Sequence, residues 1–248
     1  MRPLTFVAYA PALVAGDARS LSLIRAMEDF LPYDKLVFSV SESNTLQRIE
    51  NRDAMLDSAA RYGKIPFLCN GVEGRLVSVS GYSTPPKLGQ GGQSVLDVAI
   101  MLPEIASYVK LAGTFLLRTC ERLRSFWAVG SPKTTAAQIG AQTTLPGNPH
   151  QPPLGLPPLL PSFRLPDPFI PQRLGWLNYW SAKTTMILGF PDSSAEPELV
   201  ARSQMGSDGG WVVKLTESPL DLSEPTHLAV LRKAYDRFPA VGGRQLPP

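Results

Sequence analysis

An uncharged, proline-dense segment constrains the fold of this 248-residue chain more than any other feature. Between Lys133 and Arg164 there is no Asp, Glu, Lys or Arg, and prolines recur from Pro146 to Pro171. Proline at this density excludes helices and central strands, because its ring fixes φ and removes a backbone donor. A disordered linker is polar or charged, yet this segment is rich in leucine. We therefore expect residues 134–172 to form a proline-rich strap, with an interdomain linker as the alternative.

The two halves of the strap differ in composition. Residues 134–149 are more polar, and we expect them to be mobile. The second half carries apolar side chains that would pin an extended chain to the domain surface. These are Leu154, Leu156, Leu159, Leu160, Phe163 and Leu165.

Periodic patterns on both sides of the strap predict short strands mixed with helices. Alternating apolar residues predict strands, and apolar residues three and four positions apart predict helices. The predicted strands cover residues 4–10, 36–41, 65–69, 75–80, 95–102, 174–181 and 211–216. The predicted helices cover residues 18–31, 45–63 (beginning near Ser43 or Thr45), 103–126, 195–205 and 223–238.

The order of these elements indicates an α+β fold. Consecutive strands without intervening helices pair antiparallel, which argues against a doubly wound parallel sheet. The regular apolar stripe of residues 103–126 is typical of a helix lying across a sheet. We expect residues 1–248 to form a single α+β domain, with a largely antiparallel sheet and helices packed mainly on one face.

The charge pattern gives no sign of a nucleic-acid or membrane partner. The formal net charge is only +3, and Lys and Arg are scattered. The densest group, Arg118, Arg122 and Arg124, is interpreted as the solvated side of a helix, with a phosphate site as the alternative. No stretch approaches the roughly 20 apolar residues of a transmembrane helix. The apolar run at residues 4–10 is too short for a signal peptide, so we expect a cytoplasmic protein.

Metal-ligating residues do not cluster in the sequence. Zinc sites need Cys and His in pairs at short spacing, whereas Cys69, Cys120, His150 and His227 are all isolated. The two cysteines lie in apolar surroundings, which favours buried, reduced thiols over a disulfide. We expect neither a metal nor another cofactor.

Motifs for nucleophilic or acid–base catalysis are equally weak. The segment 78–81 only loosely resembles a nucleophile elbow. The glycine-rich segment 89–94 lacks the Lys and Ser/Thr of a P-loop and precedes a strand, which indicates a hairpin loop. Acidic pairs such as Glu28 with Asp29 lie on the polar sides of amphipathic helices, where solvation explains them. We therefore expect a protein that is not an enzyme.

An aromatic run followed by acids is the strongest candidate for a binding site. Trp and Tyr dominate binding hot spots, and carboxylates steer association with basic surfaces. One alternative is that the aromatic residues form a packed cluster against the sheet. Another is that Trp176 and Trp180 are buried and only Tyr179 and the acids are accessible. The candidate partner-binding residues are Trp176, Tyr179, Trp180, Asp192, Glu196 and Glu198.

Several segments together resemble one family. The segments 174–181 and 188–192 resemble sequence patterns of a myxobacterial domain of unknown function, as do 9–14, 66–71 and parts of 209–239. Members of that family resemble the immunity protein 52 group, whose genes lie beside those of polymorphic toxins, including nuclease-like lipoprotein toxins. The resemblance implies a protein that neutralises one cognate toxin, encoded by an adjacent gene, through tight binding. It carries no catalytic residues with it.

Two other functions remain open at this point. One is a scaffold or interaction protein that uses the strap as its docking arm. The other is a small hydrolase with an unrecognised serine or carboxylate site, which would need a deep pocket with perturbed titrating groups.

Overall fold

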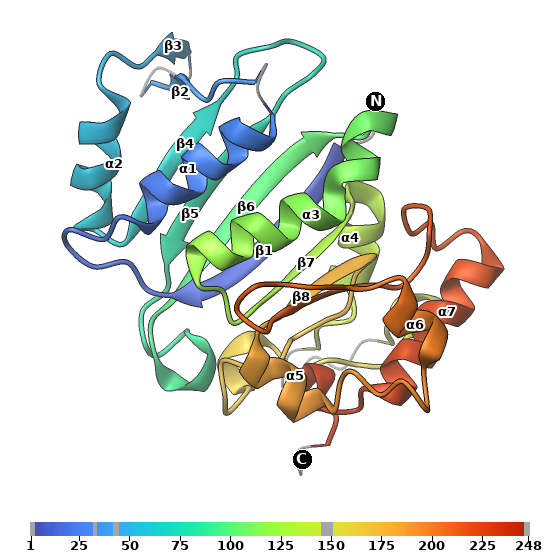
Figure 1. Cartoon of the computed structure of the whole chain (residues 1–248). Helices are drawn as coiled ribbons and strands as arrows, with labels where there is room; N and C mark the ends of the chain where they lie inside the picture. The colour runs from blue at the N-terminus through green and yellow to red at the C-terminus, as the bar shows by residue number, and fades with distance from the viewer. Residues whose placement is uncertain (1–2, 32–33, 42–44, 145–150, 246–248) are drawn as a thin grey trace.

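A single twisted sheet organises the chain. The computed structural model describes residues 3–31, 34–41, 45–144 and 151–245, and Figure 1 shows the sheet crossing the molecule. Its strand order is β3-β2-β4-β5-β6-β1-β7-β8-β10-β9, and every neighbouring pair is antiparallel. The strands are β1 (Pro3–Pro11), β2 (Phe38–Val40), β3 (Leu46–Arg48), β4 (Lys64–Cys69), β5 (Ser78–Ser83), β6 (Val95–Pro103), β7 (Trp127–Pro132), β8 (Leu177–Trp180), β9 (Gln204–Met205) and β10 (Trp211–Lys214). The predicted antiparallel α+β fold is confirmed.

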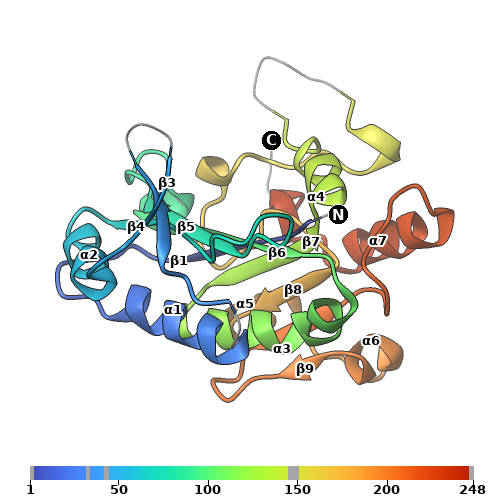
Figure 2. The ribbon, with the colours of Figure 1, turned by 90° about the horizontal axis from the view of Figure 1, so that it is seen from above.

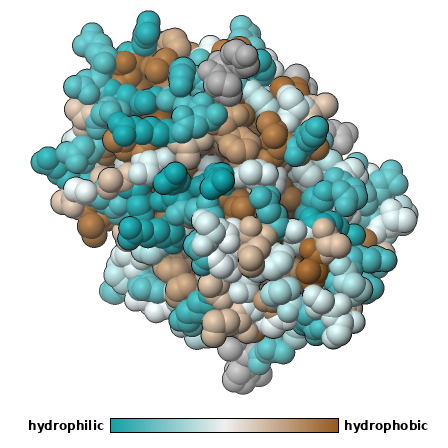
Figure 3. Space-filling model, in the orientation of Figure 1, coloured by the Kyte–Doolittle hydropathy of each residue, from teal (hydrophilic) through white to brown (hydrophobic). Residues whose placement is uncertain are grey.

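Helices lie on both sides of this sheet, and two of them lie next to each other on one face. Figure 2 shows α1 and α3 side by side below the sheet and α4 above it. The helices are α1 (Arg19–Phe30), α2 (Arg52–Ala60), α3 (Ala106–Leu123), α4 (Lys133–Gly140), α5 (Ala182–Leu188), α6 (Pro197–Ala201) and α7 (Pro225–Arg237). Short 3-10 turns are η1 (Gln90–Gly92), η2 (Pro153–Gly155), η3 (Ser162–Arg164) and η4 (Val241–Gly243). Hydrophilic side chains predominate on the outer surface of the α1–α3 layer (Figure 3).

The main core lies between the sheet and the α1–α3 layer. Alternate residues of β1 are buried, as the period of two in a strand requires. One of them, Phe6, packs against Phe115 of α3 with ring centroids 5.6 Å apart. Because the stripe of α3 is buried from Ala112 to Leu123, the predicted helix across the sheet is confirmed.

The strap is part of the fold in its second half. Leu156, Leu159 and Leu165 are buried, and Leu159 forms a parallel bridge with Thr143. The backbone N–H of Leu160 donates to the carbonyl of Gly242 at 3.0 Å. The expected pinning by leucines is therefore confirmed for these buried residues. The side chains of Leu154 and Phe163 are exposed instead.

The first half of the strap differs from the expectation of mobility. Residues up to Gly140 form α4, which contains no proline and can therefore complete its helical hydrogen bonds. Thr135 and Ile139 are buried, and the hydroxyl of Thr135 donates to the carbonyl of Leu220 at 2.6 Å. The prediction was wrong as far as residue 144; residues 145–149 lie outside the described part of the chain.

Three predicted helices end or begin elsewhere. The predicted helix 45–63 is replaced by β3 and the shorter α2, and its alternative start at Ser43 lies outside the described residues. The helix predicted to reach residue 126 ends at Leu123, because Arg124 has the left-handed φ of 55°. The following residues form β7, an inner strand between β1 and β8. The helix predicted to reach residue 205 ends at Ala201, and edge strand β9 follows.

Candidate functional site

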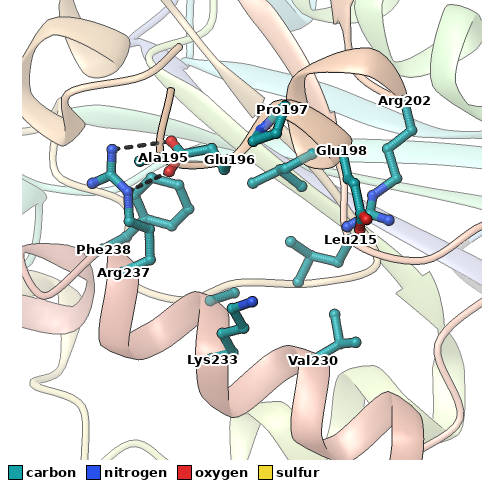
Figure 4. Close-up of a pocket in the computed structure, with 12 residues that line it drawn as sticks. Ala195, Glu196, Pro197, Glu198, Arg202, Leu215, Val230, Lys233, Arg237 and Phe238 are labelled. Carbon is teal, nitrogen blue, oxygen red and sulfur yellow. Dashed lines mark hydrogen bonds and ion pairs between the residues drawn. The ribbon is translucent and has the colours of Figure 1, made fainter. Parts of the chain in front are cut away.

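An open groove between α6 and α7 collects charged residues from both helices. Its volume is about 450 Å³, and Figure 4 shows α6 on one side and α7 on the other. The lining residues are Ala195, Glu196, Pro197, Glu198, Leu199, Arg202, Leu215, Val230, Lys233, Ala234, Arg237 and Phe238. Two of the predicted binding residues, Glu196 and Glu198, are therefore in this α6–α7 groove.

A bidentate ion pair fixes one end of the groove. The guanidinium of Arg237 donates to the two carboxylate oxygens of Glu196 at 2.6 and 3.0 Å, as Figure 4 shows. The same guanidinium donates to the carbonyl of Gly189 at 2.9 Å and lies over the ring of Phe238. Paired Arg–carboxylate hydrogen bonds impose geometry as well as energy. The Glu196 side chain is only 10% exposed, so it serves to join α6 to α7.

The walls of the groove carry charges that remain available to a partner. Glu198 lies in the first turn of α6 and Lys233 on α7, and both are exposed. Within the described ranges, neither has an ion pair with another residue. Arg202 is held differently, because its Nε donates to the carbonyl of Lys214 at 2.9 Å. The groove thus presents one acid and one base from opposite walls (Figure 4).

The floor of the groove is apolar. Leu215, Ala234 and Phe238 are buried there, and Leu199 and Val230 are half-buried beside them. Apolar surface surrounded by charged residues is typical of a protein interface, where a partner side chain is desolvated at the centre and polar groups remain at the rim.

The three predicted aromatic residues lie beneath this surface. Trp176, Tyr179 and Trp180 are each at most 2% exposed. The physical reason is that β8 is an inner strand between β7 and β10, and α3 packs on one of its faces. The interpretation of the run as an exposed rim is therefore corrected, and so is the one in which Tyr179 stays accessible, whereas the packed aromatic cluster against the sheet is confirmed.

Each of these aromatic side chains has an internal partner. The indole N–H of Trp176 donates to the carbonyl of Thr216 at 2.8 Å, and the hydroxyl of Tyr179 donates to Asp208 at 2.9 Å. Trp180 packs edge-on against Phe238 with centroids 4.9 Å apart. Because Phe238 lines the groove, the aromatic cluster supports the floor from below.

Asp192 lies at the entrance to α6 and is held by local hydrogen bonds. Its Oδ1 accepts from the backbone N–H groups of Ser194 and Ala195 at 3.0 and 3.1 Å, and from the Ser194 hydroxyl at 2.7 Å. These hydrogen bonds, the one from the hydroxyl first, lower the pKa of Asp192. The Nη2 of Arg237 lies 4.0 Å from the Oδ2 of Asp192. Asp192 therefore shapes the turn that leads to Glu196.

The basic residues of the groove were missed by sequence reasoning. Lys233 and Arg237 are on the polar side of an amphipathic helix, and that pattern alone indicates solvation. Their spacing of four residues places them on one face of the helix. That face is distinguished only by its contact with α6, which is a long-range feature of the fold.

Comparison with known proteins identifies the family. Residues 15–246 match the model of a family described as a domain of unknown function, DUF5953. The chain belongs to this family. Membership confirms the predicted link to a domain of unknown function, whereas the resemblance to the immunity protein 52 group stays a prediction. No curated protein matches this chain.

Among solved structures, this DUF5953 chain is similar to the "Pseudomonas aeruginosa T6SS protein PA0821". The TM-score is 0.59 at 12% sequence identity, and the alignment covers 97% of this chain and 73% of the other. At this identity the similarity shows a shared fold alone.

Cys69, Cys120 and His227 of this DUF5953 protein are not among the residues that line the groove. In the described ranges, no three His, Cys, Asp or Glu residues are grouped so that they would hold a metal ion; His150 lies outside those ranges. Cys69 and Cys120 are free and buried, and burial raises the pKa of both thiols. His227 accepts a hydrogen bond at Nδ1 from the backbone N–H of Asp221. No described helix has the length and apolar character needed to cross a membrane.

Proposed function

We propose that this protein is an immunity protein, which neutralises a cognate toxin encoded by an adjacent gene through direct, tight binding at the α6–α7 groove. The observation that carries this proposal is the groove itself, in which exposed Glu198 and Lys233 flank an apolar floor. The fold that this chain shares with a protein described as a T6SS protein also supports the proposal.

The groove suits a protruding loop of a partner protein. An apolar side chain of that loop would contact the half-buried Leu199 and Val230, which pack beside the buried Leu215 and Phe238. A basic group of the partner would meet Glu198, and an acidic group would meet Lys233. Pre-organised walls reduce the entropy cost of binding, because the Glu196–Arg237 pair already fixes α6 against α7.

The alternative of a scaffold protein with the strap as its docking arm has less support. The buried leucines of the strap contact the rest of this chain, and the strap backbone is hydrogen-bonded to residues 91 and 242 outside it. A docking arm would have to release these interactions before it could bind anything else. Binding by the α6–α7 groove requires no such release.

Rescue from the toxin in living cells tests the proposal. We expect co-expression of this chain to restore growth of cells that express the toxin of the adjacent gene, and not of cells that express a paralogous toxin. Lys233→Glu should weaken rescue, because it replaces the free base of the groove with an acid. The matched control Lys87→Glu changes an exposed lysine in the loop between β5 and β6 and should rescue normally.

Two outcomes of this experiment have different meanings. If the unmodified chain is soluble and abundant but killing is unchanged, the immunity function is wrong. If the unmodified chain rescues and Lys233→Glu rescues equally well, with Glu198→Lys giving the same result, the toxin binds elsewhere and the assignment of the groove is wrong.

A further inference from the structure

A second groove, between α1 and α3, concentrates positive charge. Its volume is about 410 Å³. It is lined by Ser22, Arg25, Ala26, Asp29, Phe30, Arg118 and Arg122. The two helices therefore bring together three arginines and a single acid along one open channel, which we call the α1–α3 groove.

Sequence spacing alone grouped these arginines differently. The sequence predicts that Arg118, Arg122 and Arg124 form the solvated side of one helix. In the structure, Arg118 and Arg122 are one turn apart on α3, whereas Arg124 follows the end of the helix and does not line the groove. Arg25 of α1 takes its place. Arginines brought together from two separate helices indicate a binding site more strongly than arginines on the solvated side of a single helix.

The arginines of the groove are only partly neutralised. The Nη1 of Arg118 lies 3.5 Å from the Oε2 of Glu121. The Oε1 of Glu121 accepts two hydrogen bonds from Ser207, one from the backbone N–H and one from the hydroxyl. Arg25 reaches Asp53 at 3.4 Å, and both of these side chains are more than half exposed. Arg122 has no ion pair within the described ranges. Exposed pairs of this kind contribute little, so the guanidinium groups remain free to bind another anion.

The shape of the groove favours an acidic protein segment as its occupant. Pockets for small ligands are mostly apolar and bury most of the ligand, whereas here Arg25 and Arg118 are 63% and 58% exposed. A nucleic-acid site extends over many phosphates, whereas this short channel between two helices offers only three arginines. Two or three carboxylates match the arginines present, because each guanidinium binds a carboxylate through two parallel hydrogen bonds.

We propose that the α1–α3 groove is a second docking surface, which binds an acidic segment of a protein partner through Arg25, Arg118 and Arg122. Identification of that partner with the cognate toxin rests on the proposed function above. The affinity of the groove for carboxylates does not depend on it. Because its charges are exposed, the groove mainly increases the association rate of the partner and makes that rate sensitive to salt.

A peptide titration tests the carboxylate site by itself. The probe is a fluorescent hexaglutamate peptide with blocked ends, titrated with the full chain at low ionic strength. The double variant Arg118→Gln with Arg122→Gln should weaken binding by about tenfold or more, because it removes two charge-assisted contacts. The matched control is Arg61→Gln with Lys64→Gln, two exposed basic residues near the end of α2, and it should bind within about twofold of the unmodified chain.

Three results would overturn the proposal. One is absence of peptide binding by the unmodified chain, and another is equal binding by the Arg118 and Arg122 double variant. The third is tighter binding of a single-stranded oligonucleotide than of the peptide, with loss in the same double variant, which would make the groove a nucleic-acid site. Circular dichroism melting of each variant separates loss of binding from loss of folding.

Association kinetics with the toxin separate this inference from the proposed function. If the toxin binds but the Arg118 and Arg122 double variant leaves the association rate and its salt dependence unchanged, the identification of the toxin as partner fails and the immunity function stands. If the peptide binds as expected but the chain neither binds the toxin nor rescues cells, the carboxylate site stands and the immunity function fails.

Discussion

The strap provides the sharpest test of how this fold is held together, and Leu159→Ala is the perturbation. The Leu159 side chain is 1% exposed and lies against η4, where it occupies the space that a Cβ on Gly242 would need. Its backbone N–H donates to the carbonyl of Gln142 at 3.0 Å, and its carbonyl accepts from Thr144 at 3.0 Å. The substitution keeps these hydrogen bonds and removes only the packed side chain.

The expected cost follows from the size of the cavity that is left. Buried Leu→Ala substitutions lower the free energy of unfolding by about 2–5 kcal/mol, from lost transfer energy and the residual cavity. Because Leu159 belongs to the strap, which relaxes more easily than a sheet, we expect about 3 kcal/mol. For a domain of this size, each kcal/mol lowers Tm by about 2–4 °C, so the shift is roughly 6–12 °C.

Urea unfolding followed by tryptophan fluorescence measures this loss. The matched control is Leu154→Ala on the same strap, where the side chain is 40% exposed. We expect the control to change the free energy of unfolding by no more than about 0.5 kcal/mol. If Leu159→Ala behaves like the control, the strap does not contribute to the fold and the reasoning from burial is refuted.

Three further predictions concern charges and thiols. Glu196→Gln should lower the free energy of unfolding by about 1–2 kcal/mol because it weakens the pair with Arg237, whereas Glu198→Gln should change it by less than about 0.5 kcal/mol in the same urea assay. Burial raises the pKa of Asp97 to about 6. Since the carboxyl of the unfolded chain has a pKa near 4, the folded state binds more protons between about pH 4 and pH 6. The free energy of unfolding should therefore fall as the pH rises from about 4 to 6. Asp97→Asn should remove that fall, and an unchanged pH profile of unfolding would contradict it. A thiol reagent should modify the buried Cys69 and Cys120 only as the protein unfolds, so reaction of either in native buffer would count against the packing described.

Local patterns were sufficient for elements whose residues decide their own conformation. The strand at Val95–Pro103 alternates clearly, and the stripe from Ala112 to Leu123 repeats at helical spacing. By contrast, β7 follows the helix directly with apolar residues, and only its pairing with β1 and β8 marks it as a strand. Strand pairing is a long-range property that no local window contains.

The candidate site was only half predictable for a similar reason. The acids at Glu196 and Glu198 were found because charge follows an aromatic run in the sequence, although that run is buried. Arg237, the basic partner of Glu196, lies 41 residues further along the chain on α7, and nothing in either segment specifies the other. Burial of Trp180 under Phe238 likewise depends on the position of β8 inside the sheet.

The affinity of this chain for the proposed cognate toxin, expected to be encoded by the adjacent gene, tests the central claim most directly. Isothermal titration of the two purified proteins should give a 1:1 complex with a Kd in the nanomolar range, as expected for a tight protein inhibitor. Lys233→Glu should raise that Kd by about tenfold or more, and Lys87→Glu should leave it within about twofold. Absence of a complex at micromolar concentrations, or an unchanged Kd for Lys233→Glu, would contradict the account.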